Sequence, residues 1–403
     1  MAGQGTGNVS PHWLARYRLG RSQGVGPRTY QRLLAKFPNP EEALQALPRL
    51  AAKAKRPCAV QSVDQALEEI SATDNLGGEI ILHGDQAYPP LLAQLPDPPP
   101  LLFTKGWPGL LSQKGIGIVG ARHASAAGLR VVAEMASMLA SQGYSVVSGL
   151  ARGIDGAAHK AALAHGLTIA AVAGGLDQPY PPQHASLHED IAHHGCLVTE
   201  MPPGTLPRAQ LFPRRNRLIA GLTLGTVIVE GALRSGTLIT ARLALSYDRV
   251  VMAVPGHPLD LRSGGGNQLI KDGAALVCNG QDVLEAVCLL PGLKTPPQGP
   301  RSGHGQRPTM THSRGEADLF SLQTNAPANA VQHPRPERGL QQTDADKGGE
   351  LRAAVLELLS DVPASPDTLA ASCGCPIGAL MALLGELELS GLAVNTGAGF
   401  TRA

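Results

Sequence analysis

The sequence predicts an α/β protein with a doubly wound, mostly parallel central sheet, an N-terminal helical domain and a C-terminal winged-helix domain. Between residues 115 and 280, short apolar runs alternate with glycine loops and with runs of helical length. This alternation is typical of strand–loop–helix units, and therefore of a parallel sheet covered by helices. Residues 349–403 contain three helical runs and then a short hairpin pattern, which is the element order of a winged helix.

The apolar runs of the central region predict strands that are buried on both faces. We expect strands over residues 116–119, 144–147, 168–172, 196–198, 226–229 and 249–254. We expect helices between them, for example over residues 129–142, 155–165 and 237–247. Such a Rossmann-like sheet binds ligands at the carboxyl ends of its strands.

Changes in composition divide the chain into five parts. The expected parts are an N-terminal helical domain (1–75), a proline-rich extended connector (76–111), the Rossmann-like domain (112–290), a disordered linker (291–348) and the winged helix (349–403). The first part contains Gly24-Val25-Gly26-Pro27, a Gly-x-Gly pattern between short helices that is typical of a helix-hairpin-helix (SAM-like) domain. Such a turn either contacts phosphate or is an ordinary helical turn.

The overall composition excludes several classes of protein. The formal net charge is only +2 and aromatic residues are 3% of the chain, so nucleic-acid binding must depend on local clusters rather than on global charge. The six cysteines are scattered without zinc-site spacing, so we expect no metal ion and a reducing compartment. The first residues lack a basic stretch followed by an apolar one, so we expect no signal peptide. No apolar run is long enough to span a membrane, so we expect a cytoplasmic protein without a membrane partner.

Four loops at the expected carboxyl edge carry glycines, hydroxyls and arginines. The first two loops contribute Gly120, Arg122, Ser125, Ser148, Gly149, Arg152 and Gly153. The third and fourth contribute Phe212, Arg214, Arg215, Asn216, Arg217, Ser235, Gly236 and Thr237. Glycine lets a backbone approach a phosphate, and a guanidinium donates a fork of hydrogen bonds to its oxygens. Four such loops together predict a site for a phosphate-rich ligand.

Two side chains in these loops have alternative roles. Asp155 either caps the helix that starts near it or contacts the ligand directly. Phe212, beside the arginines, either stacks on a base or packs in the core.

Other ligand classes fit the central loops less well. The match Gly115-x-Gly117-x-x-Gly120 to a dinucleotide fingerprint lies within the strand, and no acidic residue ends the second strand. The Walker lysine motif is missing, and no nucleophile–base pair is evident. We therefore expect a binding protein without a cofactor and not an enzyme. The alternatives are a phosphoribohydrolase-like nucleotide-processing enzyme, with Glu230 as its acid, and a pure interaction scaffold.

The winged-helix region is acidic. Between residues 349 and 403 there are six Asp or Glu residues against only Arg352 and Arg402. The expected recognition helix carries two glutamates and no lysine or arginine, so it could not neutralise phosphates. We expect this domain to make protein contacts or to be structural.

At the central loops the sequence resembles the DNA-processing protein A (DprA/Smf) family. The matching stretches are VGARHAS (119–125), VVSGLARGIDGAAH (146–159), GGLDQPYPP (174–182), TEMPPG (199–204), FPRRNRLIAGL (212–222), RSGTLITARLA (234–244), AVPGHP (253–258) and GGGNQLIKDGA (264–274). Their order and spacing agree over about residues 112–280. The helical domain and the winged helix resemble those of the longer family members.

The resemblance implies a function in natural transformation and recombination. Members bind and protect incoming single-stranded DNA, help to displace single-strand binding protein, load the RecA recombinase and act as homodimers. By motif, Arg122 and the segment from Arg214 to Arg217 would contact phosphates, and Phe212 would lie in the path of the strand. The tyrosine-proline loop departs from the family, because His184 replaces the usual asparagine and Pro182 stands where some members have lysine.

Overall fold

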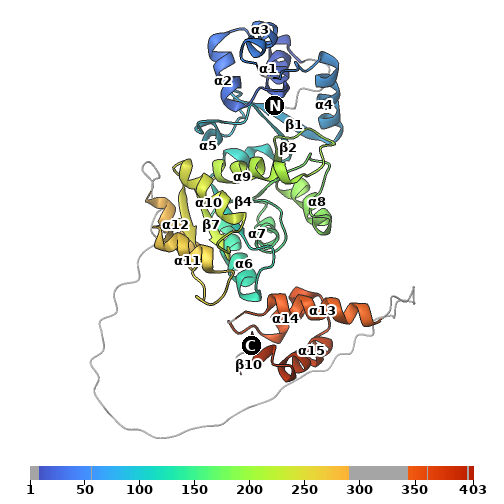
Figure 1. Cartoon of the computed structure of the whole chain (residues 1–403), viewed down its shortest axis with the longest axis vertical. Helices are drawn as coiled ribbons and strands as arrows, with labels where there is room; N and C mark the ends of the chain where they lie inside the picture. The colour runs from blue at the N-terminus through green and yellow to red at the C-terminus, as the bar shows by residue number, and fades with distance from the viewer. Residues whose placement is uncertain (1–8, 56, 290–343, 361, 397–398) are drawn as a thin grey trace.

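The protein is described by a computed structural model that covers residues 9–55, 57–289, 344–360, 362–396 and 399–403. Figure 1 shows the N-terminal helices at one end, the central sheet and its helices in the middle, and the winged helix at the other end. The expected fold class is confirmed in all three regions.

The N-terminal domain consists of four short helices. They are α1 (Pro11–Arg21), α2 (Pro27–Lys36), α3 (Pro40–Lys53) and α4 (Val63–Asn75). The first three helices begin with proline, which is tolerated at the first helical position because the N–H it lacks would have no helical partner. Ser62 starts α4 with a capping box in which Gln65 is the reciprocal partner.

Within the described residues, nine strands form one sheet in the order β1-β2-β6-β5-β4-β3-β7-β8-β9. The strands are β1 (Gly78–Leu82), β2 (Leu101–Gly106), β3 (Gly115–Gly120), β4 (Ser145–Ser148), β5 (Thr168–Ala171), β6 (Cys196–Thr199), β7 (Gly225–Val229), β8 (Val250–Ala253) and β9 (Ala275–Leu276). The pairs from β6 to β9 are parallel, and β3 and β7 pair from Ile116↔Gly225 to Gly120↔Val229. The six strands expected from apolar runs are all confirmed, within a few residues at each end.

The expectation of an extended connector over residues 76–111 is wrong. This segment contributes β1 and β2, which extend the sheet with antiparallel pairings, and α5 (Pro90–Ala93) and the 3-10 helix η1 (Pro108–Ser112). The prolines lie between the two strands and not inside them, so no ladder hydrogen bond is lost. The sheet domain therefore begins near residue 78.

Helices cover both faces of the sheet (Figure 1). The remaining helices of this domain are α6 (Ala126–Ser141), α7 (Ile154–Leu163), η2 (Pro182–His184), α8 (Ala185–His194), η3 (Ala209–Leu211), α9 (Phe212–Gly221), α10 (Thr237–Ser246), α11 (Gly264–Lys271) and α12 (Gly280–Cys288). One apolar cluster joins the sheet to α6, α7 and α12, and another joins it to α9 and α10. These two clusters fix where each helix begins, and so they fix the loops at the carboxyl edge.

The C-terminal domain contains three helices and a two-stranded hairpin. They are α13 (Asp344–Leu358), α14 (Pro366–Cys373), α15 (Ile377–Leu389), β10 (Ala393–Asn395) and β11 (Phe400–Arg402). Because α13 already begins at residue 344, the domain starts earlier than the expected residue 349. The rest of the expected linker, residues 291–343, lies outside the described residues. Among those that are described, no single helix is long and apolar enough to cross a membrane, although the bent pair α14–α15 passes the same criteria when it is taken together.

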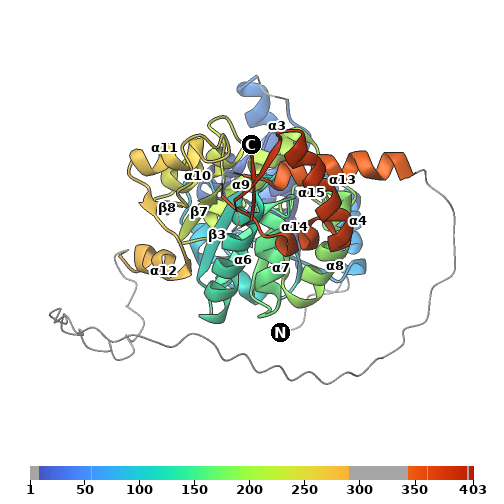
Figure 2. The same ribbon diagram turned by 90° about the horizontal axis from the view of Figure 1, so that it is seen from below.

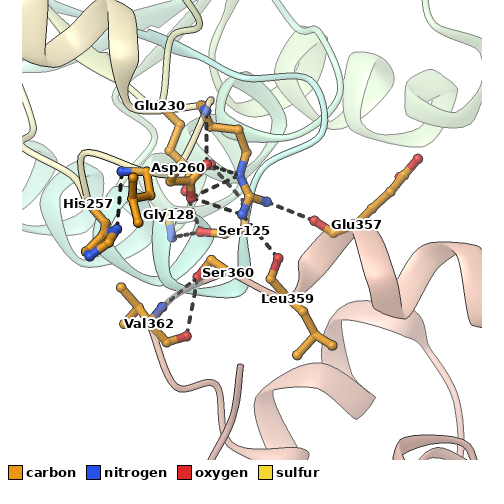
Figure 3. A network of polar contacts seen from close by, with 11 residues as sticks. Ser125, Gly128, Glu230, His257, Asp260, Glu357, Leu359, Ser360 and Val362 are labelled. Atoms are coloured by element: carbon orange, nitrogen blue, oxygen red, sulfur yellow. Dashed lines mark hydrogen bonds and ion pairs between the residues drawn. The ribbon is translucent and has the colours of Figure 1, made fainter. Parts of the chain in front are cut away.

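The winged helix packs against α6 through α14, and Ala126, the first residue of α6, belongs to its apolar cluster. Figure 2 shows the winged helix in front of the central domain when the molecule is viewed from below. Arg262 donates hydrogen bonds to the backbone oxygens of Glu357 (2.9 Å) and Leu359 (3.1 Å), at the C-terminal end of α13. These carbonyls have no acceptor role inside the helix, and a cation is favourable at this end of the helix dipole. Asp260 fixes the guanidinium with several hydrogen bonds, as Figure 3 shows.

Candidate functional site

The topology places one crevice at the carboxyl ends of β3 and β7. After β3 the chain continues to β4, β5 and β6 on one side, and then returns to β7, β8 and β9 on the other side of β3. The loops that follow β3 and β7 therefore separate, which is where doubly wound sheets bind ligands. A groove of about 490 Å³ lies there, and it contains Gly120, Arg122, Ser235, Gly236 and Thr237. The structure thus brings together residues from the first and fourth predicted loops.

A second cavity of about 270 Å³ continues the groove toward the loop after β5. Both cavities are lined by Arg122, Ala151, Phe212 and Arg215, so they share one wall. Gly149 and Arg152 from the second loop line the second cavity. All four predicted loops therefore meet along one continuous surface.

The N-terminus of α10 is open toward this groove. Its N-cap is Gly236, which provides no side-chain cap, and a Cβ added there would meet no described atom within 4 Å. The Oγ of Ser235 is buried and finds no hydrogen-bond partner among the described residues. The N–H of Ser235 donates to the backbone oxygen of Ala232 (3.0 Å), whereas those of Gly236 and Thr237 have no partner among the described residues. Free N–H groups, an unpaired hydroxyl and open space at a helix N-terminus are the features of an anion site.

Phe212 lies at the centre of the surface. Its ring centroid is 5.8 Å from the Cζ of Arg122, 5.3 Å from the Cζ of Arg215 and 5.8 Å from the ring of Tyr180, which meets it edge to face. The ring is half-buried, so it contributes to packing and still reaches the cavities. The alternatives of stacking and packing are therefore compatible for this residue.

Three arginines stand free at the rim. Arg122, Arg152 and Arg214 are exposed, and within the described part of the chain none of them makes a hydrogen bond or an ion pair. Arg122 lines both cavities, Arg152 lines the second, and Arg214 lines a further groove of about 300 Å³ against the N-terminal domain. Free guanidinium groups beside an anion site favour an extended polyanion over a single phosphate.

Arg215 belongs to the interior instead. Its side chain is 10% exposed, and it donates hydrogen bonds to the backbone oxygen of Gly149 and to Oδ1 of Asn216. The Oδ2 of Asp155 lies 3.9 Å from the Nη1 of Arg215, and the Asp155 side chain is also buried. Burial raises the pKa of Asp155 and lowers that of Arg215, while each charge opposes the shift of the other. The Arg215 guanidinium therefore lies in the wall that both cavities share, with the Asp155 carboxylate beside it.

Asp155 organises the second loop. The helix α7 has Gly153 as its N-cap, so the expectation that Asp155 caps this helix is wrong. Its Oδ2 instead accepts from the N–H groups of Gly149 (3.2 Å) and Ala151 (3.4 Å). This carboxylate shapes the loop and leaves Arg152 at the rim.

Arg217 is paired with a neighbouring carboxylate. Its guanidinium makes two hydrogen bonds to Glu200, and their side chains are 13% and 8% exposed. The phosphate contact of this residue stays a prediction, and its donors bind Glu200 and the backbone oxygen of Asp97 in this structure. This pair instead anchors the start of α9 to the end of β6.

Two predicted hydroxyls are also bonded within the protein. Ser148 donates to the backbone oxygen of Ile118 (2.6 Å), and Ser125 donates to Glu230 while it caps α6 through the N–H of Gly128 (3.0 Å). Both serines are fully buried. They hold the loops in place but cannot reach a ligand.

Three predicted glycines are needed by the packing of the protein itself. A Cβ at Gly120 would meet the backbone of Val229, one at Gly149 would meet Arg215, and one at Gly153 would meet the backbone of Ala121. Gly153 also has a positive φ of 71°. Close approach is thus the correct reason for glycine here, but the approaching group belongs to the chain.

The loop after β5 adds residues that the sequence patterns did not select. Gln178, Tyr180, Pro182 and Gln183 line the second cavity opposite Arg152. The departure at His184 is accommodated, since its Nδ1 lies 3.1 Å from the backbone oxygen of Leu150 and supports the second loop. The run of tyrosine and prolines in this loop was the available signal.

The site offers donors and stacking surfaces but no evident reaction centre. In the described ranges, no group of three or more His, Cys, Asp or Glu side chains could hold a metal ion. Glu230, the acid that a hydrolase would need, has both carboxylate oxygens bound to Ser125. The arrangement is suited to holding a chain of phosphates and unpaired bases.

Comparisons with known proteins cover all three domains. A family model for the DNA recombination-mediator protein A matches residues 79–288, a DprA-like N-terminal HHH domain matches 11–72, and a DprA winged helix domain matches 335–399. A DNA processing protein DprA of Bacillus subtilis is 44% identical over 200 residues, which are 49% of this chain and 67% of that protein. The matched part of a putative DprA of Mycobacterium tuberculosis is 62% of its length.

Two further relatives extend the match. The protein Smf of Synechocystis is 31% identical over 407 residues, with 94% of this chain and 95% of that protein covered. The X-ray structure of DNA processing protein A from Streptococcus pneumoniae aligns with a TM-score of 0.54 and 31% identity, over 69% of this chain and 98% of that one.

Proposed function

The chain belongs to the DNA processing protein A (DprA/Smf) family, and on that premise we propose that it binds single-stranded DNA along the groove at the carboxyl ends of β3 and β7. The observation that carries this proposal is the open N-terminus of α10 beside the free rim arginines. One feature alone would suit a mononucleotide. Together they suit a strand that carries one phosphate after another.

The proposed contact set is smaller than the one expected from the sequence. Phosphates would bind Arg122, Arg152, Arg214, the hydroxyl of Ser235 and the backbone N–H groups of Gly236 and Thr237. Arg215 and Asn216 line the groove as buried polar groups. Gly120, Ser125, Ser148, Gly149, Gly153 and Arg217 would position these groups without touching the ligand.

Phe212 and Tyr180 support the choice of a single strand. A flat ring at the junction of two cavities can stack on a base only if that base is unpaired. Such stacking is worth roughly 1–3 kcal/mol per base and tolerates any sequence. The proposed site therefore prefers single strands and has little base preference.

The remaining expectations follow from the family and are part of the same proposal. The protein would protect incoming strands in the cytoplasm during natural transformation, help displace single-strand binding protein and load RecA, as a homodimer. It would act by binding and without turnover. The bonding of both Glu230 oxygens to Ser125 supports this choice over the hydrolase alternative.

Fluorescence anisotropy of a labelled oligo-dT, titrated with the protein at several salt concentrations, tests the proposal. With three phosphate contacts, a plot of the logarithm of the association constant against the logarithm of the salt concentration should have a slope of about −2. A duplex competitor should displace little of the probe. Failure to bind oligo-dT at low salt, or equal displacement by duplex, would contradict the proposal.

A further inference from the structure

The helix that follows the first strand of a doubly wound sheet usually receives the phosphates of a ligand. In this chain that strand is β3 and the helix is α6. The first turn of α6 should therefore be the strongest anion site on the carboxyl edge. It follows Gly120, Ala121 and Arg122, which line the groove.

A carboxylate of the protein already occupies this position. The Oε2 of Glu230 accepts a hydrogen bond from the N–H of Ser125 (2.9 Å), and its Oε1 accepts from the Ser125 hydroxyl. Ser125 is the N-cap of α6, so the negative charge sits on the positive end of the helix dipole. Figure 3 shows Glu230 directed at Ser125 and Gly128.

The surrounding backbone is shaped to admit this carboxylate. A Cβ at Gly128 would lie 2.7 Å from the Cδ of Glu230, so a larger residue there would push the side chain out. Glu230 itself has a φ of 52°, a conformation that most residues with a side chain avoid. Strain of this kind persists only where the surrounding contacts hold the residue in place.

The N-terminus of α10 presents the opposite arrangement. There Gly236 leaves the helix uncapped, and the Ser235 hydroxyl has no partner in the described part of the chain. The loop that leads into α6 and the loop that leads into α10 border the same groove, since Gly120 and Ser235 both line it. The N-terminus of α6 therefore binds the Glu230 carboxylate, whereas the N-terminus of α10 binds no described side chain.

We propose that Glu230 is a specificity-determining residue, a resident anion that closes the α6 N-terminus to phosphate and directs an incoming phosphate to Ser235, Gly236 and Thr237. The chain thereby rejects dinucleotides, whose pyrophosphate needs the first site, and keeps the groove for a strand that runs along the rim. This inference rests on the proposed function, because it assumes that α10 is the phosphate site that is used.

Titration of the full-length protein with inorganic phosphate, followed by its backbone amide resonances, tests the proposal. In the wild type, the amides of Ser235, Gly236 and Thr237 should shift and saturate, and those of Ser125 and Gly128 should stay fixed. The variant Glu230→Gly removes the carboxylate and suits the positive φ. In it the Ser125 and Gly128 amides should also shift and saturate.

Asp248→Gly is the matched control. Asp248 is an exposed acid with a φ of 56°, so the same change is made at the same backbone geometry, in the turn before β8. This variant should behave like the wild type. If Glu230→Gly does not fold, Glu230→Asn replaces it, because asparagine tolerates the left-handed region and its shorter, neutral side chain withdraws from Ser125.

The outcomes separate this inference from the proposed function. A wild-type Ser125 amide that saturates with phosphate overturns the inference, and so does a folded Glu230 variant in which Ser125 remains silent. A response at Ser125 in Asp248→Gly overturns it as well. Silence at Ser235, Gly236 and Thr237 in every protein would instead remove α10 as the phosphate site and contradict the proposed function.

Discussion

The arginines at the carboxyl edge form two groups. Arg122, Arg152 and Arg214 lie exposed at the rim, whereas Arg215 and Arg217 lie in the interior. The sequence around these residues does not distinguish the two groups. Arg214, Arg215 and Arg217 lie within four residues of one another, yet Arg214 is exposed while the side chains of the other two are 10% and 13% exposed. The interior arginines bind buried carboxylates, and the rim arginines make no hydrogen bond or ion pair with a described group. The basic run over residues 214–217 therefore contains residues that hold the site in shape and a residue that is free to contact the ligand.

The difference has an energetic origin. A charge taken out of water needs a partner, and removing that partner leaves an uncompensated charge in the interior. A rim charge remains solvated and can be deleted with little effect on folding. Substitutions in the interior should therefore change stability, and substitutions at the rim should change affinity.

Arg215→Ala should give the largest effect in this comparison. It leaves Asp155 buried beside an empty space, and the loss of one member of a buried pair typically costs about 3–5 kcal/mol. Chemical denaturation measures the change, with Arg214→Ala as the control, which should stay within about 0.5 kcal/mol of the wild type. Equal stability of the two variants would break the distinction between rim and interior.

Low pH should destabilise the interior through His159, which hydrogen-bonds to the second loop. Its Nε2 accepts from the N–H of Leu150 (3.3 Å), and its Nδ1 lies 2.7 Å from Oγ1 of Thr168. Burial, reinforced by His184 and Arg215, lowers the pKa of His159 to about 3. The unfolded chain binds a proton below about pH 6.5 and the folded chain does not, so stability falls as pH decreases between these values.

The expected loss is at most about 1.4 kcal/mol per pH unit for one proton. Unfolding free energies measured at several pH values between 6.5 and 4 give the slope. His159→Gln retains an acceptor for Leu150 and should show a shallower slope than the wild type. An identical slope in the two proteins would show that His159 does not titrate on unfolding.

Arg122→Ala should weaken binding of oligo-dT by roughly 1–3 kcal/mol, the range for a charge-assisted hydrogen bond, without changing stability. Arg122→Lys keeps the charge but loses the planar fork, so its affinity should fall between those of the wild type and the alanine variant. Anisotropy and thermal melting measure the two quantities. Unchanged affinity of the alanine variant would remove Arg122 from the proposed contacts.

The smallest effect should come from deleting residues 349–403. The winged helix is acidic and contributes no lining residue to either cavity of the proposed site within the described chain. Glu357 contacts His123, next to Arg122, with 2.9 Å between its Oε2 and the Nδ1 of His123. Both side chains are exposed, so this charge is screened over about 8 Å at physiological salt. Anisotropy at that salt should give nearly the wild-type affinity, and a large loss would place part of the DNA path on the winged helix.

Much of this organisation could be predicted from local sequence. The strands of the parallel sheet are short apolar runs with their own signal, and each glycine loop lies between a run and a helix. The sheet extension by β1 and β2 was missed because the prolines between these strands hid two runs that pair only with distant partners. Leu102 lies opposite Ile81 in that pairing, and Phe103 lies opposite Thr199.

The sequence predicts less well which site residues are free to contact a ligand and which are bonded inside the protein, because this depends on partners far away in the sequence. Nothing near Ser125 indicates that its hydroxyl binds Glu230, 105 residues later. Likewise, Arg217 differs from Arg214 only in facing Glu200, on the end of a neighbouring strand. Residue type predicted the chemistry of this edge, and tertiary contacts decided which residues are free to use it.

The bond between Arg262 and the end of α13 links two domains that lie far apart in the sequence. The carbonyls of Glu357 and Leu359 are satisfied by a side chain that only the folded central domain can present. When the central domain melts, that contact is lost and the end of α13 depends on water alone. Contact with the central domain therefore contributes to the thermal stability of the winged helix. We expect the two domains to unfold as partly coupled units and not independently.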